Sequence, residues 1–366
     1  MEVPFNRPLI LGTEQAALNK VFKSGKFAGN GELGAKCQVA LEDKLAVGKT
    51  LLTTSCTSAL ELACILLDIG PGDEVIIPSY AFVTTANAFA SRGAKVVFAD
   101  SKEESPCIDE SLVEALIAQN TKAIVALHYA GIACDMDVLN TIAKKHGVAI
   151  IEDNAQGLAA TYKGRALGSV GTVAALSFHE TKNIHCGEGG ALCLNSKKLY
   201  QRADKVWDMG TNRDDFKAGR VNSYGWVDIG SSFYPSELNA AFLLEQLAHL
   251  EEVNQRRFSL WDQYHDQLGF LETTGVAALP SVPTYAKHNG HTFYLTCGSE
   301  TDRNALIAYL GKNGVNATFH FQSLHKSDFF KDKHTGNELP NSDRFSQCLV
   351  RLPLYYNLTE QEQNYV

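Results

Sequence analysis

The sequence has no excess of positive charge. It contains 33 lysine and arginine residues against 41 aspartate and glutamate residues, which gives a formal net charge of -8 at pH 7. A protein whose main partner is nucleic acid needs a basic face that neutralises phosphates. The charge balance therefore argues against DNA or RNA as the main partner, although it still allows a local cationic pocket.

The sequence also lacks the features of secreted and membrane-inserted chains. Met1–Asn6 has no basic stretch followed by an apolar core, so no signal peptide is expected. No apolar run reaches about 18 residues, so no membrane span is expected. The nine cysteines are odd in number and include no C-x-x-C pair, which indicates reduced, buried thiols rather than a disulfide framework. These features predict a cytoplasmic protein.

Several catalytic signatures are absent or incomplete. No G-x-S-x-G motif and no P-loop is present, so hydrolase and nucleoside triphosphatase functions lack support. Gly29–Gly34 matches G-x-G-x-x-G, but neither the preceding strand nor the later acidic residue of a dinucleotide site accompanies it. We interpret it as a glycine-rich turn. His179-Glu180 begins a zinc motif, but Asn183 stands where the second histidine is needed, and no other ligand set is complete.

Hydrophobic periodicity predicts an α/β protein with a mostly parallel central sheet flanked by helices. Short apolar stretches alternate with amphipathic helical stretches from about residue 37 to 195, a pattern typical of a sheet covered on both faces. Strands are expected at Lys49–Thr53, Glu74–Ile77, Lys95–Ala99, Ala123–Leu127, Ala149–Glu152, Ala174–Phe178 and Gly190–Leu194. Helices are expected between them at Thr57–Leu67, Ala81–Arg92, Leu112–Gln119 and Val138–His146.

A change in composition predicts a second domain. One long helical region is expected from Pro235 to about Leu268, and a smaller α/β unit follows it. We place the boundary near residue 245. The chain is thus divided into a large domain, residues 1–245 with an N-terminal arm at 1–36, and a small C-terminal domain, residues 246–366.

Lys182 is the most informative single residue. It follows the expected strand at Ala174–Phe178 and precedes the glycine-rich stretch Gly187–Gly190, a poor position for a solvated charge. A desolvated lysine has a lowered pKa, and enzymes use such lysines to form Schiff bases. Taken alone, a loop lysine that neutralises a carboxylate is the simpler interpretation. The functional interpretation therefore depends on what stands at the other strand ends.

Polar and aromatic residues follow several other expected strands. Ser55–Leu60 closes one strand and opens a helix, where free amides with the hydroxyls of Thr57 and Ser58 make either an anion site or a plain helix cap. Phe82 follows the next strand and can stack on a heteroaromatic ring or pack in the core. Asp153 ends a third strand, where a carboxylate can keep a ring nitrogen protonated or cap the following helix.

Two further side chains complete this set. Gln156 stands three residues after Asp153 and can reach a ring hydroxyl, and Ser177 offers another hydroxyl for a phosphate. An anion cradle, a stacking aromatic ring, a strand-end carboxylate and a loop lysine are the parts that a pyridoxal phosphate site requires. Each motif is weak alone, but together and in this order they predict such a site.

The chain resembles the DegT/DnrJ/EryC1/StrS family of sugar aminotransferases, within the fold-type I pyridoxal phosphate enzymes, nearly from end to end. The motifs that carry the resemblance are Pro71–Val75, Pro78–Asn87, His128–Gly131, Glu152–Gln156, Ser177–Asn183 and Gly187–Gly190. Other stretches are more similar to a member that makes a 4-amino-4,6-dideoxygalactose for enterobacterial common antigen, namely Ser55–Thr57, His128–Asp137, Tyr162–Gly168, Gly210–Arg213 and Asp228–Ser232.

The resemblance implies a role for each candidate at the cofactor ring. Lys182 would hold the cofactor covalently and later carry the proton. Asp153 would pair with the pyridine nitrogen, Gln156 would contact the ring oxygen, and Phe82 would stack on the ring. A dehydratase branch of the family has histidine in place of the lysine, and Lys182 argues against it.

The resemblance also assigns the cofactor phosphate to Thr57, Ser58 and Ser177. This sequence departs from many relatives at two positions. Cys56 stands where they have glycine, and Ser232 stands where they have an asparagine that reaches the phosphate of the partner subunit. A weaker or different contact between subunits is therefore expected from Ser232. A homodimer with active sites at the interface is implied.

The reaction implied by the resemblance is a two-stage transamination. L-glutamate would give its amino group to the cofactor, which would then aminate dTDP-4-keto-6-deoxy-D-glucose to dTDP-4-amino-4,6-dideoxy-D-galactose. A 3-keto or UDP-linked keto-sugar stays an alternative substrate, because charge and spacing do not distinguish these sugars. A non-catalytic pyridoxal phosphate-binding regulator is the alternative from another class, although no basic helix-turn-helix segment is present. The nucleotide-sugar cleft is expected to involve Lys26, Phe27, His320 and His325.

Overall fold

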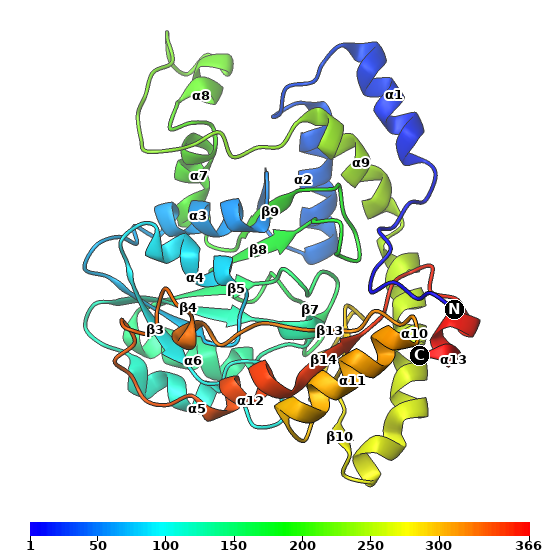
Figure 1. Ribbon diagram of the computed structural model, residues 1–366. Helices are drawn as coiled ribbons and strands as arrows, with labels where there is room; N and C mark the ends of the chain where they lie inside the picture. The colour runs from blue at the N-terminus through cyan, green and yellow to red at the C-terminus, as the bar shows by residue number, and fades with distance from the viewer.

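A computed structural model describes residues 1–366 (Figure 1). The large domain contains a seven-stranded sheet in the order β1-β9-β8-β5-β4-β2-β3. Its strands are β1 (Lys49–Thr53), β2 (Glu74–Pro78), β3 (Lys95–Ala99), β4 (Thr121–Leu127), β5 (Ala149–Asp153), β8 (Val173–Ser177) and β9 (Gly190–Leu194). Only β9 runs antiparallel to its neighbours β1 and β8, and all other pairs are parallel. The predicted mostly parallel sheet is confirmed.

Helices cover both faces of this sheet because successive strand residues point to opposite sides. On β2, Val75 and Ile77 belong to the core under α3 and α4, whereas Ile76 belongs to the core that includes α6. At the other end of the sheet, Leu52 and Ala174 pack with α2 and α9. These helices are α2 (Glu32–Leu45), α3 (Cys56–Leu66), α4 (Val83–Ala90), α6 (Met136–His146) and α9 (Glu237–Ala248).

Two expected helices differ from the structure. The helix expected at 112–119 is replaced by the short α5 (Glu110–Val113) and a 3-10 turn at Glu114–Leu116. The long helix expected from Pro235 is two helices, α9 and α10 (Leu250–Thr273), which meet at His249, where φ is -106° and ψ is 11°. The apolar periodicity continues across this break, so the sequence pattern alone does not reveal it.

A second, antiparallel sheet is built from residues after α10. Its order is β10-β12-β14-β13, and helix α11 (Glu300–Lys312) and helix α12 (Pro340–Cys348) contact it. The strands are β10 (Ala277–Ala278), β12 (Phe293–Cys297), β13 (Thr318–Phe319) and β14 (Leu349–Leu352). The N-terminus joins this unit, since Val3 bridges Val315, and both termini lie beside α10 (Figure 1). The boundary at residue 245 stays a prediction.

A small three-stranded sheet connects the two parts of the chain. It contains β6 (Thr161–Tyr162), β7 (Arg165–Ala166) and β11 (Ala286–Lys287), in the order β11-β6-β7. β11 comes from the segment after α10, whereas β6 and β7 follow β5, so their pairing holds the second unit against the loop that follows Asp153.

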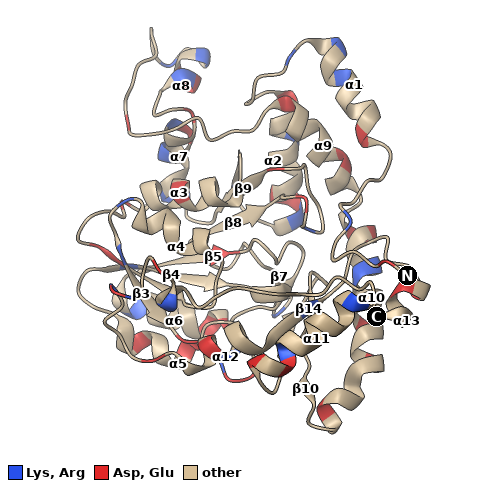
Figure 2. Ribbon diagram, viewed as in Figure 1, with Lys and Arg blue, Asp and Glu red and all other residues tan.

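The surface carries a mixture of positive and negative side chains. Figure 2 shows lysine and arginine dispersed among acidic residues, without a continuous basic face in that view. All nine cysteines are free and eight are buried, as the sequence predicted. No helix of residues 1–366 has both the length and the hydropathy that are needed to cross a bilayer.

Candidate active site

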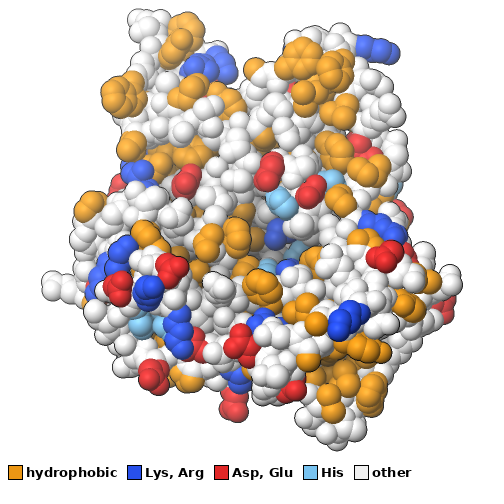
Figure 3. Space-filling view, viewed as in Figure 1, with side chains coloured by type: hydrophobic (Ala, Val, Ile, Leu, Met, Phe, Trp, Pro, Cys, Tyr) orange, Lys and Arg blue, Asp and Glu red, His pale blue; other side chains and the backbone are white.

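A cavity of about 480 Å³ lies at the carboxyl ends of the parallel strands, where an open α/β sheet binds its ligands. Its wall combines the ends of β5 and β8, the first turns of α3 and α4, and residues from the second sheet and the N-terminal arm. Figure 3 shows this cavity as a hollow near the centre of the view, with lysine or arginine and histidine side chains in its depth.

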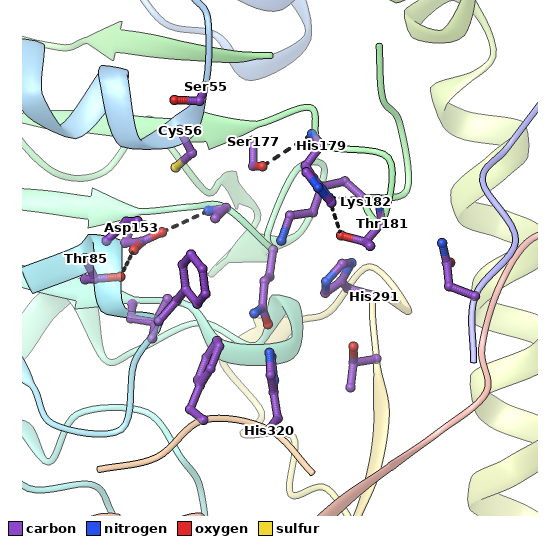
Figure 4. Close-up of a pocket in the computed structure, with 18 of the residues that line it drawn as sticks. Ser55, Cys56, Thr85, Asp153, Ser177, His179, Thr181, Lys182, His291 and His320 are labelled. Carbon is purple, nitrogen blue, oxygen red and sulfur yellow. Dashed lines mark hydrogen bonds between the residues drawn. The ribbon is translucent and has the colours of Figure 1, made fainter. Parts of the chain in front are cut away.

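Lys182 lies in the loop between β8 and β9 and lines the cavity. Its backbone N–H donates to the His179 carbonyl at 2.9 Å, and its side chain extends into the cavity (Figure 4). Burial lowers the pKa of the Lys182 amine, while the Cys56 thiol and the Asp153 carboxylate oppose the shift. A desolvated amine of this kind is more often neutral and nucleophilic than a surface lysine.

The glycine at position 190 lets this loop return close to α3. A Cβ atom on Gly190 would lie 2.4 Å from the Ser55 carbonyl carbon and 2.6 Å from the Cys56 nitrogen, both of them backbone atoms. No side chain fits there without moving the first turn of α3. The start of β9 is thereby packed directly against the N-terminus of the helix that borders the cavity.

Asp153 ends β5 with its carboxylate fixed in the cavity wall. One oxygen accepts from the Thr85 hydroxyl at 2.7 Å and the other accepts from the Ala155 N–H at 3.2 Å (Figure 4). Burial raises the pKa of Asp153, and these donors and the Lys182 charge partly reverse the shift. Thr85 was not predicted as a separate site residue, because its only signal in the sequence is its place one turn after Phe82.

Gln156 also lines the cavity, and its amide orientation is determined by the backbone. The side-chain oxygen accepts from the Ala130 N–H at 2.6 Å. The amide nitrogen is therefore the group that is left to donate to a ligand. This arrangement suits contact with a ring oxygen, the role that the family resemblance implies.

The first turn of α3, where either an anion site or a plain helix cap was expected, lies at the cavity. Ser55 is the N-cap, and its hydroxyl accepts from the Ser58 N–H at 3.1 Å. Thr57 lines the cavity together with Ser177, whereas Ser58 does not and instead shares its hydroxyl with Thr54 and Ser55. The helix cap is therefore present, and the anion site at this helix N-terminus stays a prediction.

The two remaining predicted residues lie in different surroundings. Phe82 is 54% exposed and lines the cavity, with its ring centroid 6.0 Å from that of Phe321, so it is available for stacking and is not a core residue. Ser232 is exposed, bridges Asp208 and does not line this cavity. Its predicted contact is with a partner subunit and stays a prediction.

Of the four residues expected at the sugar cleft, only His320 lines the cavity. Its Nδ1 lies 2.8 Å from the Tyr129 hydroxyl, and burial holds the pKa of its imidazole well below the usual value. His325 is turned toward Ser79, with Nδ1 2.7 Å from the hydroxyl oxygen, and Lys26 and Phe27 lie outside the lining.

His291 lines the cavity beside Lys182 (Figure 4). From the sequence it was expected only as a polar-pocket or surface histidine, and no role in the site was assigned to it. Its Nδ1 is 3.0 Å from Oδ1 of Asn183, whose amide nitrogen donates to Asn254 and to the Asn289 carbonyl. Because Oδ1 of Asn183 can only accept, Nδ1 of His291 carries the proton. Burial and the Lys182 charge hold the pKa of His291 well below its usual value, so Nε2 is an uncharged acceptor.

The set of side chains fits pyridoxal phosphate. The exposed face of Phe82, the buried Asp153 carboxylate and the Lys182 amine surround one cavity with the open N-terminus of α3. These supply, in order, a stacking surface, a partner for a ring nitrogen, an aldehyde-reactive amine and a phosphate site. No group of three or more histidine, cysteine or acidic side chains in the chain could hold a metal ion.

Comparison with known proteins agrees with this geometry. Residues 8–366 match the model of the DegT/DnrJ/EryC1/StrS aminotransferase family. The structure is similar to the aminotransferase TlmJ from Streptoalloteichus hindustanus, with 29% identity and a TM-score of 0.92 over 100% of this chain and 97% of that one. It is also similar to DesV from S. venezuelae, solved in complex with a ketimine intermediate, with 28% identity, a TM-score of 0.90 and coverage of 99% and 96%. Spr1654 from Streptococcus pneumoniae, assigned as a sugar aminotransferase and solved in a PLP form, matches at 25% identity and a TM-score of 0.91 over 100% and 96%.

Proposed function

The chain belongs to the DegT/DnrJ/EryC1/StrS aminotransferase family, and we propose that it aminates the C4 ketone of dTDP-4-keto-6-deoxy-D-glucose with L-glutamate as donor. The product would be dTDP-4-amino-4,6-dideoxy-D-galactose, as in the transaminase of enterobacterial common antigen synthesis. The fold and the cofactor, pyridoxal phosphate, follow from the family and from solved structures in cofactor-bound forms. The substrate assignment is supported by the motifs at Ser55–Thr57, Tyr162–Gly168 and Asp228–Ser232.

One observation carries the catalytic part of the proposal. The Lys182 amine enters a cavity that also contains the Asp153 carboxylate and the open first turn of α3. When bound there, pyridoxal phosphate supplies an electron-withdrawing ring that stabilises negative charge on the carbon that loses its proton. The remaining work of binding, orientation and proton transfer falls to side chains of this chain.

Lys182 is proposed to hold the cofactor and then to act as general base and general acid. Its amine is suited to this because burial lowers its pKa, so that the unprotonated form is reached more readily than in a surface lysine. In the donor half of the reaction it takes the proton from the α-carbon of glutamate, and in the acceptor half it delivers a proton to the sugar carbon that receives nitrogen. Nε2 of His291 lies at the same wall and can accept a hydrogen bond from this amine or from a substrate hydroxyl.

Asp153 is proposed to keep the ring nitrogen protonated. The hydrogen bonds from Thr85 and Ala155 hold its carboxylate in one orientation, so no rearrangement is needed as charge develops. Gln156 would donate its amide N–H to the ring oxygen, and Phe82 would cover one ring face. The roles of Asp153 and Gln156 match the acceptor and donor atoms that the surrounding structure leaves free, and the role of Phe82 matches its exposed ring.

Thr57 and Ser177 are the proposed phosphate ligands within the subunit, together with the first amides of α3. Ser58 stays in the proposal only through its place in that first turn, since its hydroxyl is shared with Thr54 and Ser55. A helix N-terminus and two hydroxyls satisfy an anion without a lysine or arginine nearby.

We also propose a homodimer with active sites at the interface. Helix α1 (Glu14–Ser24) and the segment around α8 (Arg213–Lys217) project from the same side of the large domain and carry exposed apolar side chains (Figures 1 and 3). Trp226 is 84% exposed. Ser232 lies in the same segment, which supports a contact from it to the neighbouring subunit. The nine free cysteines support a reducing, cytoplasmic location.

The substrate is tested with a panel of nucleotide keto-sugars. The purified protein, loaded with pyridoxal phosphate, is incubated with L-glutamate and with dTDP-4-keto, dTDP-3-keto and UDP-4-keto sugars, and the products are identified by NMR. We expect amination of the dTDP-4-keto sugar with the galacto configuration. A product aminated at C3 or formed only from the UDP sugar would replace the substrate assignment, and no amination of any sugar would favour a non-catalytic binding role.

The lowered pKa of Lys182 predicts a pH dependence for cofactor attachment. In cofactor-free protein, the rate at which the amine reacts with added pyridoxal phosphate should rise with pH, because only the unprotonated amine reacts. The midpoint of this rise should lie below about 10.4, the usual lysine pKa. Asp153→Asn removes a negative charge that raises this pKa, so its midpoint should lie lower than that of the wild type. The growth of the visible absorption band, followed from neutral to alkaline pH, measures both. A midpoint that rises in the variant would contradict the assigned proximity.

A further inference from the structure

Glu152 is a fully buried acid beside Asp153 on β5. Consecutive residues of a strand point to opposite faces of the sheet, and of these two only Asp153 lines the cavity. The Glu152 side chain is 0% exposed, and none of the proposed cofactor contacts uses it. A buried charge is costly unless hydrogen bonds compensate it. The groups that compensate Glu152 are therefore firmly held by it.

Four donors surround the Glu152 carboxylate. Oε1 accepts from the Val170 N–H at 2.8 Å and from the Gly171 N–H at 2.6 Å. Oε2 accepts from the Gly168 N–H at 2.8 Å and lies 3.0 Å from Nε2 of His128. Burial alone would raise the pKa of Glu152, but the hydrogen bonds outweigh it and lower the pKa, so the carboxylate stays ionised.

The ring of His128 closes a loop and is itself held by Glu152. Its Nδ1 accepts from the Cys134 N–H at 3.2 Å, so Nδ1 carries no proton and Nε2 is the nitrogen that donates to Glu152. His128 is fully buried and directly follows β4. Its side chain therefore ties together the two ends of the loop 128–134.

The middle of this loop has a backbone conformation that needs support. Ala130 has a φ of 58° and Gly131 a φ of 78°, both in the left-handed region, where a residue with a side chain is strained. A Cβ atom on Gly131 would lie 2.0 Å from Oδ1 of Asn289, so the loop is closely packed on that side. In this conformation the Ala130 N–H donates to the side-chain oxygen of Gln156 at 2.6 Å.

The Ala130 N–H decides which end of the Gln156 amide is left for a ligand. The oxygen of an amide accepts and its nitrogen donates, and the two ends have nearly the same shape. With its oxygen engaged by Ala130, Gln156 offers an N–H to the cavity. Without that contact the amide can turn over and present its oxygen, which repels an ionised ring oxygen.

We propose that His128 and Glu152 are positioning residues of the active site, which fix the loop 128–134 so that Gln156 presents a donor to the ring oxygen of the cofactor. The inference rests on the proposed contact between Gln156 and that oxygen. Neither His128 nor Glu152 lines the cavity, so both act through Ala130 and Gln156. The pair affects how tightly the cofactor is held and not which sugar is aminated.

The test is a double-mutant cycle on the affinity for pyridoxal phosphate, which is titrated into cofactor-free protein and followed by its visible absorption. Gln156→Ala should raise the Kd by roughly 10- to 100-fold, the usual effect of losing a hydrogen bond to a charged group. His128→Leu should raise it by a similar factor when Gln156 is present. In the Gln156→Ala background it should add less than about twofold, because the amide through which it acts is already missing.

Gly131→Ala tests the same loop without touching the pair. Its methyl group would meet Asn289 and its φ is unfavourable for alanine, so the loop must move. The Kd should again rise only where Gln156 is present, and this variant decides the question if His128→Leu does not fold. His128→Gln, which keeps one donor and one acceptor, should lie between the wild type and His128→Leu.

A second histidine–glutamate pair provides the matched control. Nε2 of His146 lies 2.8 Å from Oε1 of Glu114 at the surface, away from the cavity lining, so His146→Leu should leave the Kd unchanged. Equal losses with and without Gln156 would overturn the proposal, because a merely structural pair affects both backgrounds alike. An unchanged Kd in folded His128→Leu, or in Gly131→Ala where His128→Leu does not fold, overturns it as well.

The cycle also separates this inference from the proposed substrate. An unchanged Kd in Gln156→Ala would remove the ring contact itself and overturn the inference, whereas amination of a keto-sugar in the substrate panel would still stand. Failure to aminate any sugar, in turn, would leave the cofactor affinities and their coupling intact.

Discussion

Lys182→Ala is expected to lower turnover by at least about 10⁴-fold, because general acid–base transfer and covalent attachment of the cofactor are both lost. The variant should also lack the visible absorption band of the lysine-bound cofactor. Its fold should be retained, since the side chain points into a cavity and makes no hydrogen bond with the protein. Steady-state rates with glutamate and the keto-sugar, together with the absorption spectrum, measure the two effects.

A surface lysine provides the control for this experiment. Lys163 forms an exposed ion pair with Asp137 at 2.6 Å, so Lys163→Ala should leave both the rate and the spectrum unchanged. Substantial turnover in Lys182→Ala would require another amine to carry the proton, and the cavity lining contains no other lysine.

Asp153→Asn is expected to lower kcat by roughly 10²- to 10³-fold, because a neutral amide cannot hold the ring nitrogen in its protonated form. The side chain keeps nearly the same shape, and its oxygen can still accept from Thr85. The loss should therefore appear in kcat, while the affinity for the cofactor changes less. Rates at saturating substrate and cofactor titration by fluorescence measure the two quantities.

A graded series distinguishes charge from simple packing. Thr85→Val removes the donor that orients the Asp153 carboxylate but leaves its charge, so its effect on kcat should lie between those of the wild type and of Asp153→Asn. Asp137→Asn, at an exposed ion pair, should have no effect. Wild-type kcat in Asp153→Asn would show that the ring nitrogen needs no carboxylate partner.

Local sequence patterns predicted the strands of the large domain well. The expected strands at 49–53, 95–99 and 190–194 match β1, β3 and β9 in full, and the one at 149–152 ends one residue before β5 does. A buried strand is a short apolar run bounded by turns, and that signal is local. The helices were predicted less well, since the pattern at 112–119 yields only one turn of α-helix and a 3-10 turn.

The sequence pattern placed together those candidate site residues that lie at or just after the ends of strands. Asp153 and Ser177 are the last residues of the parallel strands β5 and β8, and Lys182 follows β8. The carboxyl ends of such strands meet at one edge of the sheet. Thr57 and Phe82 follow the same logic at the starts of α3 and α4. Ser58 was included because it neighbours Thr57, but a hydroxyl's direction depends on its hydrogen-bond partners, which the sequence does not contain.

The amino-acid sequence by itself determined the alternation of strands and helices, and therefore which segments lie at the binding edge of the sheet. Only the tertiary structure decided the other wall of the cavity. Arg351 comes from the second sheet, His291 from the segment just before β12, and Phe5 from the N-terminal arm. All three are more than 100 residues from Lys182 along the chain. Periodicity reports contacts between neighbours in sequence, whereas these side chains meet because two separately formed units pack against each other.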